Sequence, residues 1–312
     1  MEPYTLQKRT QQIRRLAEQE GFDFCGFARA EFLAEEADRY EEWLKKGMNG
    51  KMSYLERNID KRLDPRKLVD GAESVITLLY NYYPEQDLSA QHEYKVAKYA
   101  YGNDYHFVVK RKLKALFQQI REQVGHIEGR VFVDSAPVME RQWAQRAGLG
   151  WIGKNSLLLN RTMGSFFFIA EIICDMKLEP DGPLKDYCGT CTKCMDACPT
   201  EAIPLPYVVD ASRCISYLTI ELKDEIIPDE FSGQMENWIF GCDICQDVCP
   251  WNRFASAHRE PAFVPSKQVA SLSKDDWEAL DEETFKTLFK HSPLKRTKYQ
   301  GIRRNIRFNE RI

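Results

Sequence analysis

Eight of the ten cysteines in this 312-residue chain have a spacing that suits metal ligation. Four of them form a C-x2-C-x2-C-x3-C-P run that ends at Pro199, and three more form a C-x2-C-x3-C-P run that ends at Pro250. Three thiolates on one tight loop can bind three irons of a cubic cluster, while the fourth points toward a second cluster. The spacing therefore predicts two [4Fe–4S] clusters.

Each of these cysteines can be assigned to one cluster. The second run lacks its first cysteine, and Cys214, between the runs, supplies the missing thiolate. In two-cluster proteins the fourth cysteine of each run binds the opposite cluster. One predicted ligand set is Cys188, Cys191, Cys194 and Cys249. The other is Cys198, Cys214, Cys242 and Cys245. Zinc is the alternative, but a zinc ion needs only four thiolates and does not require the Cys-Pro endings.

Composition and charge are those of an ordinary globular protein. Hydrophobic residues make up 43% of the chain and charged residues 29%, which excludes low-complexity disorder. The longest apolar runs are far shorter than the ~20 residues of a membrane-spanning helix, and the N-terminus has no signal-sequence pattern. We expect a cytoplasmic protein without membrane contact, in which clustered cysteines bind metal and do not form disulfides. The remaining Cys25 and Cys174 lie in apolar runs and are expected to be buried, inert thiols.

An alternation of helices and strands precedes the cysteines. Apolar periodicity and capping residues predict helices over 5–20, 31–46, 104–124 and 137–147. Strands are predicted over 24–27, 74–83 and 130–133. The second of these strands is apolar enough to be buried on both faces. Segments 156–159 and 165–174 are predicted to form a β-hairpin.

Three regions follow from these patterns. The elements before the cysteines form an α/β layer domain over residues 1–180. A Pro- and Gly-containing linker at 179–183 leads into a cysteine-rich domain, residues 181–257. Residues 258–312 form a C-terminal segment with a predicted helix over 274–289 and then a basic tail.

Several segments of the chain match one family, although the first domain has no Walker loop and no G-x-G-x-x-G after a strand. The matching segments are Y-G-N-D-Y-H at 101–106, V-D-S at 133–135 followed by Glu140 and Arg141, R-A-G-L-G-W-I-G-K-N at 146–155, R-C-I-S-Y-L-T at 213–219, G-C-D at 241–243, and both cysteine runs. With these segments in this order, the chain resembles the epoxyqueuosine reductases.

The resemblance implies a fold, cofactors and a reaction. The implied fold is an α/β (α+β) nitroreductase-like cobalamin domain, similar to that of the reductive dehalogenases, followed by a bacterial two-[4Fe–4S] ferredoxin-like domain. The implied reaction reduces epoxyqueuosine to queuosine at the wobble position of tRNA. Cobalamin, bound without a protein histidine on cobalt, would receive electrons from the clusters and from an external low-potential donor, because reaching Co(I) demands a strong reductant.

Asp134 is the implied catalytic residue and also a cofactor contact. A departing epoxide oxygen becomes an alkoxide unless it is protonated, so a general acid is required. We expect the flat corrin and Trp151 to raise the pKa of Asp134 so that it holds a proton. The alternative is that Asp134 only caps the 137–147 helix or the turn before it.

Other residues are implied contacts of the cofactor or the RNA. Arg62 suits the amide oxygens or the phosphate of the corrinoid, because its guanidinium donates several hydrogen bonds in a fixed fork; a solvated surface arginine is the alternative. The further implied cofactor contacts are Tyr105, His106, Lys154, Asn155, Leu158, Ser216 and Asp243.

Arginines and lysines are the implied tRNA contacts. The net charge is only −3, so tRNA has to bind a local basic patch. The implied contacts are Arg141, Lys295, Arg296 and Arg303. A solvated tail is the alternative for the last three. Longer family members continue into helical repeats beyond the point that corresponds to Ile312, and we expect this short form to be a monomer.

Two other functions fit parts of the pattern. A reductive dehalogenase-like enzyme would use the same cofactors on a small organohalide, but usually carries an export signal. A two-cluster electron-transfer protein would leave the first ~180 residues without a role, and would not bind cobalamin.

Overall fold

A four-stranded antiparallel sheet forms the centre of the N-terminal half of the chain. The structure is a computed structural model that describes residues 3–310. The sheet order is β1-β2-β7-β4, and each neighbouring pair is antiparallel. The strands are β1 (Phe24–Arg29), β2 (Ser74–Asn81), β4 (Gly129–Phe132) and β7 (Phe167–Cys174). Every residue of β2 is buried, which confirms the strand predicted from this apolar segment.

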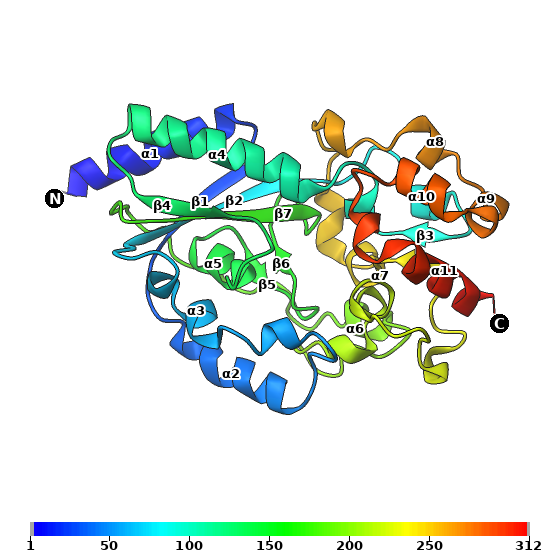
Figure 1. The fold of residues 1–312 in the computed structure, drawn as a ribbon. Helices are drawn as coiled ribbons and strands as arrows, with labels where there is room; N and C mark the ends of the chain where they lie inside the picture. Colours follow the sequence, from blue (N-terminus) through cyan, green and yellow to red (C-terminus); the bar gives the residue numbers. More distant parts are fainter. Residues whose placement is uncertain (1–2, 311–312) are drawn as a thin grey trace.

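Helices cover both faces of this sheet (Figure 1). On one face lie α1 (Pro3–Gln19) and α4 (Tyr105–Gln123), whose apolar residues pack against alternate residues of β2 and β7. On the other face lies α5 (Glu140–Arg146), which buries Trp143 against the sheet. Two further helices, α2 (Ala34–Lys45) and α3 (Ile59–Leu63), lie beyond this face. The layered α+β arrangement predicted for this region is therefore confirmed.

Two predictions about local elements are wrong. Segments 156–159 and 165–174 do not pair as a hairpin: β6 (Leu158–Leu159) pairs with β5 (Trp151–Ile152), whereas β7 pairs with β2 and β4. The reason is that β7 is apolar along nearly its whole length and is buried between two long strands. The helix expected from residue 137 begins only at Glu140, because the chain before it forms the loop that carries Asp134.

The cysteines lie on loops next to two short helices. These are α6 (Lys193–Asp196) and α7 (Ile244–Asp247), which contact each other. Between them in sequence, a single π-helical turn, Tyr217–Glu221, follows Cys214. The strand β8 (Trp238–Phe240) pairs in parallel with β3 (Lys95–Val96), so the N-terminal half contributes a strand to the region of the cysteines.

The C-terminal segment is folded. It contains α8 (Lys267–Ala270), α9 (Lys274–Ala279), α10 (Glu282–Leu288) and α11 (Lys298–Asn309). The single helix predicted over 274–289 is broken, because Asp281 caps α10 by accepting a hydrogen bond from the Thr284 N–H. The alternative of a solvated tail is wrong, since Ile302 and Ile306 of α11 are fully buried.

The outermost residues of the first and last predicted regions, 1–2 and 311–312, lie outside the described part of the chain. Within residues 3–310, no helix combines the length and the apolar character needed to cross a membrane.

Candidate active site

Asp134 projects from the loop between β4 and α5. Its φ of 55° is in the left-handed region, which is uncommon for a residue with a side chain. The Asp134 N–H donates a hydrogen bond of 2.5 Å to Oε1 of Glu140. The residue that caps α5 is Met139, so the alternative in which Asp134 caps this helix is wrong. Half of the Asp134 side chain is exposed.

His106 lies between two carboxylates on the first turn of α4. Its Nδ1 is 2.7 Å from Oδ1 of Asp104, and its Nε2 is 3.2 Å from Oδ2 of Asp134. Both ring nitrogens must therefore donate, which only the protonated imidazolium can do. Burial lowers the pKa of His106, but the hydrogen bonds to Asp104 and Asp134 outweigh burial and raise this pKa to about 9. At neutral pH His106 holds a proton.

The charge of Asp134 depends on donors from the first turn of α4. Burial raises the pKa of Asp134, but hydrogen bonds from His106 and from the Tyr105 hydroxyl outweigh it, so that the pKa is lowered. The raised pKa was expected beside a bound corrin, so for the corrin-bound site it stays a prediction. The donors on α4 were missed from the sequence.

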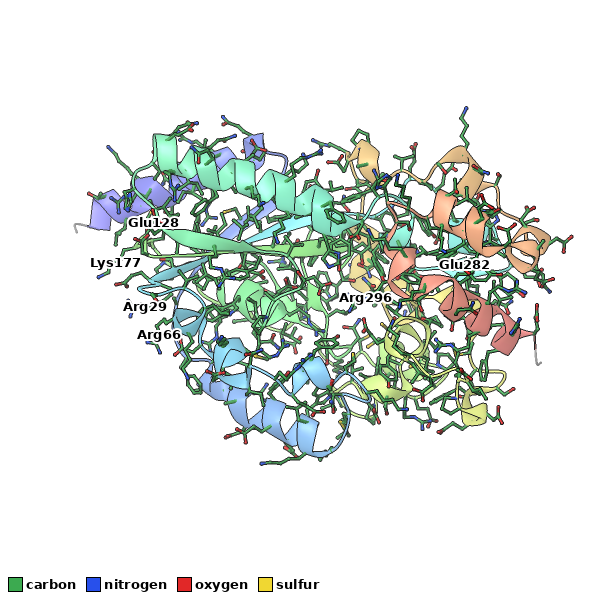
Figure 2. The ribbon with its side chains drawn as sticks, in the orientation of Figure 1. Arg29, Arg66, Glu128, Lys177, Glu282 and Arg296 are labelled. Carbon is green, nitrogen blue, oxygen red and sulfur yellow. The ribbon has the colours of Figure 1, made fainter. Side chains whose placement is uncertain are left out.

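Side chains from three distant parts of the chain meet near Asp134. The positive charge of Arg296 acts on Asp134, and its Nη2 lies 2.7 Å from Oε1 of Glu221. Arg62, on α3, donates from Nη2 to the Tyr54 carbonyl at 3.2 Å. The Tyr54 hydroxyl group lies close enough to these residues to respond to their charges. Burial and Glu221 raise its pKa to about 12, while Arg296 and Arg62 act to lower it. Figure 2 shows Arg296 between the sheet domain and the C-terminal helices.

One atom of Arg62 is suited to bind a polar ligand. Its Nε is buried and has no hydrogen-bond partner within residues 3–310. A buried donor without an acceptor costs about 1–3 kcal/mol. An amide or phosphate oxygen of a cofactor would satisfy it, so the residues present fit a corrinoid at this point.

The eight cysteines fall into two electrostatic groups. Burial raises the pKa of Cys249, and the neighbouring thiolates of Cys188 and Cys191 raise it further. Burial and then Cys249 likewise raise the pKa of Cys194. In the second group Cys214 is the thiolate neighbour with the largest effect on both Cys242 and Cys245. Cys214 also senses Cys198, but Cys245 senses Cys194 as well as Cys198, so the two groups adjoin each other and the ligand sets stay a prediction.

The geometry of the thiols fits clusters better than single ions. A cavity of about 200 Å³ is lined by Cys188, Cys191, Cys194 and Cys249. The fully buried Trp151 directs its Nε1 toward the Cys188 sulfur. Among the described residues, no three Cys, His, Asp or Glu side chains are placed to hold one metal ion. The four thiolates of a cubic iron–sulfide cluster lie farther apart than the four ligands of one zinc ion.

Several predicted cofactor contacts lie beside the cysteines. Lys154 donates from Nζ to the carbonyls of Gly189 and Cys191, at 2.7 and 2.9 Å, and the buried Asn155 donates to the Cys245 carbonyl at 3.4 Å. These two side chains join the loop after β5 to both cysteine runs. Their contact with a corrin edge stays a prediction.

The remaining predicted cofactor contacts are buried or half-buried. Leu158 is buried in β6. Ser216 begins the π-helical turn and hydrogen bonds Cys214. Asp243 is buried next to Cys242, where it accepts a 2.7 Å hydrogen bond from the Lys98 N–H. The buried Lys98 side chain adds ion pairs to Asp87 and Asp247, at 3.0 and 2.8 Å, which the sequence analysis missed.

The predicted RNA contacts divide into two groups. Lys295 lies 3.5 Å from Asp104 and over the exposed Phe107 ring, and the charge of Arg296 acts on Asp134, so both are near the His106–Asp134 pair. Arg141 is also near the His106–Asp134 pair. Burial lowers the pKa of its guanidinium, and the charges of Glu140 and Asp134 offset part of this effect. Arg303 instead donates to the carbonyls of Trp277 and Glu278, which directs it toward α9.

Comparison with known proteins identifies the family. Residues 62–135 match the family model "Epoxyqueuosine reductase QueG, DUF1730", and residues 187–252 match the "4Fe-4S double cluster binding domain". The chain is 60% identical to the epoxyqueuosine reductase of Cyclobacterium marinum over 97% of both chains. The chain belongs to the epoxyqueuosine reductase family. It is therefore an oxidoreductase, and residues 187–252 form its double [4Fe–4S] cluster domain.

Solved epoxyqueuosine reductases have the same fold. One of them, solved with a tRNA-Tyr epoxyqueuosine-modified stem loop, is 30% identical and superposes with a TM-score of 0.85 over 97% of this chain and 80% of its own. The enzyme from Bacillus subtilis, also 30% identical with a TM-score of 0.85 over 97% and 81% of the two chains, has its catalytic aspartate loop swung out of the active site. The family identity leaves no room for the alternative of a simple electron carrier.

Some residues of this epoxyqueuosine reductase site were missed from the sequence. Asp104 was predicted only as a helix cap, yet it also binds the His106 ring. Tyr54 and Glu221 carry no motif and come from segments far apart in the chain. Glu140 does stand in the segment that carries the family resemblance, and this was the available signal for its contact with Asp134.

Proposed function

We propose that this chain reduces epoxyqueuosine to queuosine at the wobble position of tRNA, with cobalamin and two [4Fe–4S] clusters as cofactors. The epoxide oxygen leaves as water, which consumes two electrons and two protons. The single observation that carries the proposal is the His106–Asp134 pair, which holds a proton close to Arg296, while Arg62 and Arg296 both act on the nearby Tyr54. Family membership supports the same reaction.

Asp134 and His106 provide the proton in this proposal. Because Asp134 is ionised at neutral pH, the mobile proton rests on His106 Nε2, 3.2 Å away. As negative charge develops on the epoxide oxygen, His106 gives this proton to Asp134, which passes it on to that oxygen. Solvent then reprotonates His106 and so supplies the second proton. Tyr105 keeps Asp134 oriented through its hydroxyl group. A general acid placed in this way contributes about 10²–10⁴-fold in rate.

Cobalamin would supply the strongly reducing cobalt that breaks the carbon–oxygen bond. Arg62 would hold its polar edge through the buried Nε and the remaining N–H groups, and the predicted contacts from Lys154, Asn155, Leu158, Ser216 and Asp243 would surround it. Eight cysteines hold the clusters that deliver the electrons, with the two ligand sets predicted from the sequence. An external low-potential donor reduces these clusters.

The tRNA stem loop would bind beside the His106–Asp134 pair. A relative solved with an epoxyqueuosine-modified stem loop supports this partner. Lys295 and Arg296 are charged groups beside the His106–Asp134 pair, and the exposed Phe107 ring offers a stacking surface. Because the net charge is −3, we expect tRNA affinity to depend on this patch and to weaken with salt. A tRNA substrate and thiolate ligands both suit an enzyme of the reducing cytoplasm. We expect it to work as a monomer.

An anaerobic turnover assay tests this function. Protein that contains both clusters is mixed with epoxyqueuosine-containing tRNA and a low-potential reductant, with and without cobalamin, and the nucleosides are analysed by mass spectrometry. We expect loss of one oxygen mass only when cobalamin is present. Unchanged epoxyqueuosine with protein that holds all cofactors would refute the proposal.

A further inference from the structure

A second carboxyl group lies directly behind the Asp134 loop. Glu140, which accepts the Asp134 N–H at 2.5 Å, faces Glu171 on the central strand β7. Glu171 is fully buried, on the face of the sheet that α5 covers. The reaction proposed above uses neither glutamate. Both carboxyl groups are therefore without an assigned role, although one of them touches the backbone of the proton donor.

The pair can be stable only if it holds a proton. Neither oxygen of Glu171 receives a hydrogen bond from an N–H or O–H group within residues 3–310. The hydroxyl of Thr77, the β2 residue opposite Glu171, makes no hydrogen bond within these residues either. The group that bonds to Glu171 is the Glu140 carboxyl. Two carboxyl groups can form a hydrogen bond only when one of them is protonated. Without that proton, two negative charges would face each other inside the protein.

The charged neighbours of the pair do not replace this proton. Burial and the nearby Asp134 raise the pKa of Glu140 to about 8, whereas Arg141 lowers it. Arg141 is directed elsewhere, since its Nη1 donates to the Ser156 carbonyl. Tyr105 also senses Glu140, but its hydroxyl group donates to Asp134. Burial raises the pKa of Glu171 well above its ordinary value, and so does the charge of Glu140.

We propose that Glu140 and Glu171 share one proton and that this shared proton fixes the Asp134 loop in its catalytic position. In this arrangement the Glu171 O–H donates to one oxygen of Glu140, and Glu140 Oε1 accepts the Asp134 N–H. The strained φ of 55° at Asp134 is thereby held from behind. When the pair loses its proton, repulsion moves Glu140 away and the loop is released. Both glutamates are positioning residues for the proton donor of the proposed function.

A moving loop is consistent with what is known of one relative. The Bacillus subtilis enzyme has a structure in which the catalytic aspartate loop is swung out of the active site. In this chain, the hydrogen bond between Asp134 and Glu140 ties that loop to the first residue of α5. Loss of this bond is the simplest route by which the loop could leave.

Hydrogen exchange tests the proposal without any need for turnover. Exchange at residues 133–139 is followed by mass spectrometry between pH 6 and 10 in cluster-loaded, cobalamin-free protein, and rates are corrected with an unstructured peptide. We expect wild-type protection to be kept at neutral pH and to fall in the alkaline range, where the pair loses its shared proton. Glu171→Gln supplies a permanent amide donor to Glu140 and should keep the protection at high pH. Glu140→Ala should lose it at every pH, and Glu140→Gln, which still has an acceptor oxygen, should retain most of it at neutral pH.

Controls separate this proposal from the proposed reaction. Glu128→Gln, at the exposed end of the sheet that Figure 2 labels, should exchange and titrate like the wild type. In turnover, Glu140→Ala should lower kcat about 100-fold with an unchanged KM for tRNA, as expected for a displaced acid. Wild-type protection in Glu140→Ala, or an unchanged pH dependence in Glu171→Gln, would overturn the positioning role. Because exchange needs no substrate, failure of the reductase assay would not affect this result.

Discussion

Nε2 of His106 lies 3.2 Å from Oδ2 of Asp134, so the proton donor of the reaction is joined to a second group that already holds the proton. His106 is on the first turn of α4, where the helix dipole disfavours a cation. Two carboxylates override this effect, since Asp104 bonds the other ring nitrogen. The cap of α4 therefore has a second task, which is to keep the imidazole charged.

The pH dependence of turnover should follow His106. Its pKa is raised from 6.5 to about 9, so the proton store is full at neutral pH and empties as the pH rises through about 9. We expect kcat to be nearly constant from pH 6.5 to 8 and to fall above that range. His106→Gln should lower kcat at neutral pH by about 10²-fold and remove this alkaline limb. His126→Gln, which alters an exposed histidine, is the matched control; a wild-type profile in His106→Gln would exclude the proton store.

Cobalamin affinity should depend on Arg62. Removing its guanidinium, whose Nε is buried, takes away charged hydrogen bonds worth about 1.5–3 kcal/mol each. Arg62→Ala should therefore bind cobalamin about 10–100-fold more weakly in an equilibrium titration. Arg66→Ala is the control, because Arg66 is an exposed residue paired with Asp64 in the next turn. Equal affinities of the two variants would show that Arg62 does not hold the cofactor.

Cluster content should distinguish the two ligand sets. The wild type should contain about eight irons per chain. Cys249→Ser removes a thiolate from the set of Cys188, Cys191 and Cys194, so we expect about four irons and the EPR signal of one remaining cluster. Cys25→Ala alters a buried cysteine outside both sets and should keep the full iron content. Loss of the other cluster in Cys249→Ser would contradict the crossed assignment.

The stability of the C-terminal segment should depend on Arg304. This residue donates to the carbonyls of Leu218, Leu222 and Asp224, at 2.7 to 2.8 Å, and so joins α11 to the π-helical turn. Arg304→Ala should lower the free energy of unfolding by about 1–3 kcal/mol, measured by urea unfolding. Arg307→Ala, on the exposed side of the same helix, should stay within about 0.5 kcal/mol of the wild type. Similar losses in both variants would show that Arg304 has no special role.

Local sequence signals predicted what depends on nearby residues. The cap of α4 at Asp104 and the fully buried β2 follow from a capping side chain and a run of apolar residues. The cysteine groups follow from spacing, because cluster geometry restricts which thiolates can meet. For the cap and the strand the deciding residues lie within one element, whereas each cysteine set combines thiolates from both runs.

Contacts between distant segments were harder to predict. The hairpin failed because β7 gains more by pairing with β2 and β4 than with the two-residue β6 next to it in sequence. The lowered pKa of Asp134 depends on His106, 28 positions earlier in the sequence and brought close only by the packing of α4 on the sheet. Arg296 was predicted for an RNA-binding tail, and no sequence pattern indicates that its charge acts on Asp134 or that it shares the neighbour Tyr54 with Arg62.

The most direct test of the central claim is a single turnover by Asp134→Asn. The asparagine fills the same space but holds no transferable acidic proton. Protein loaded with both clusters and cobalamin is reduced anaerobically, mixed with epoxyqueuosine-containing tRNA and quenched at intervals for nucleoside mass spectrometry. The wild type should convert epoxyqueuosine to queuosine, while Asp134→Asn, with unchanged iron and cobalamin content, should show at least ~10²-fold slower conversion. Conversion at the wild-type rate would contradict the role of Asp134 as the proton donor.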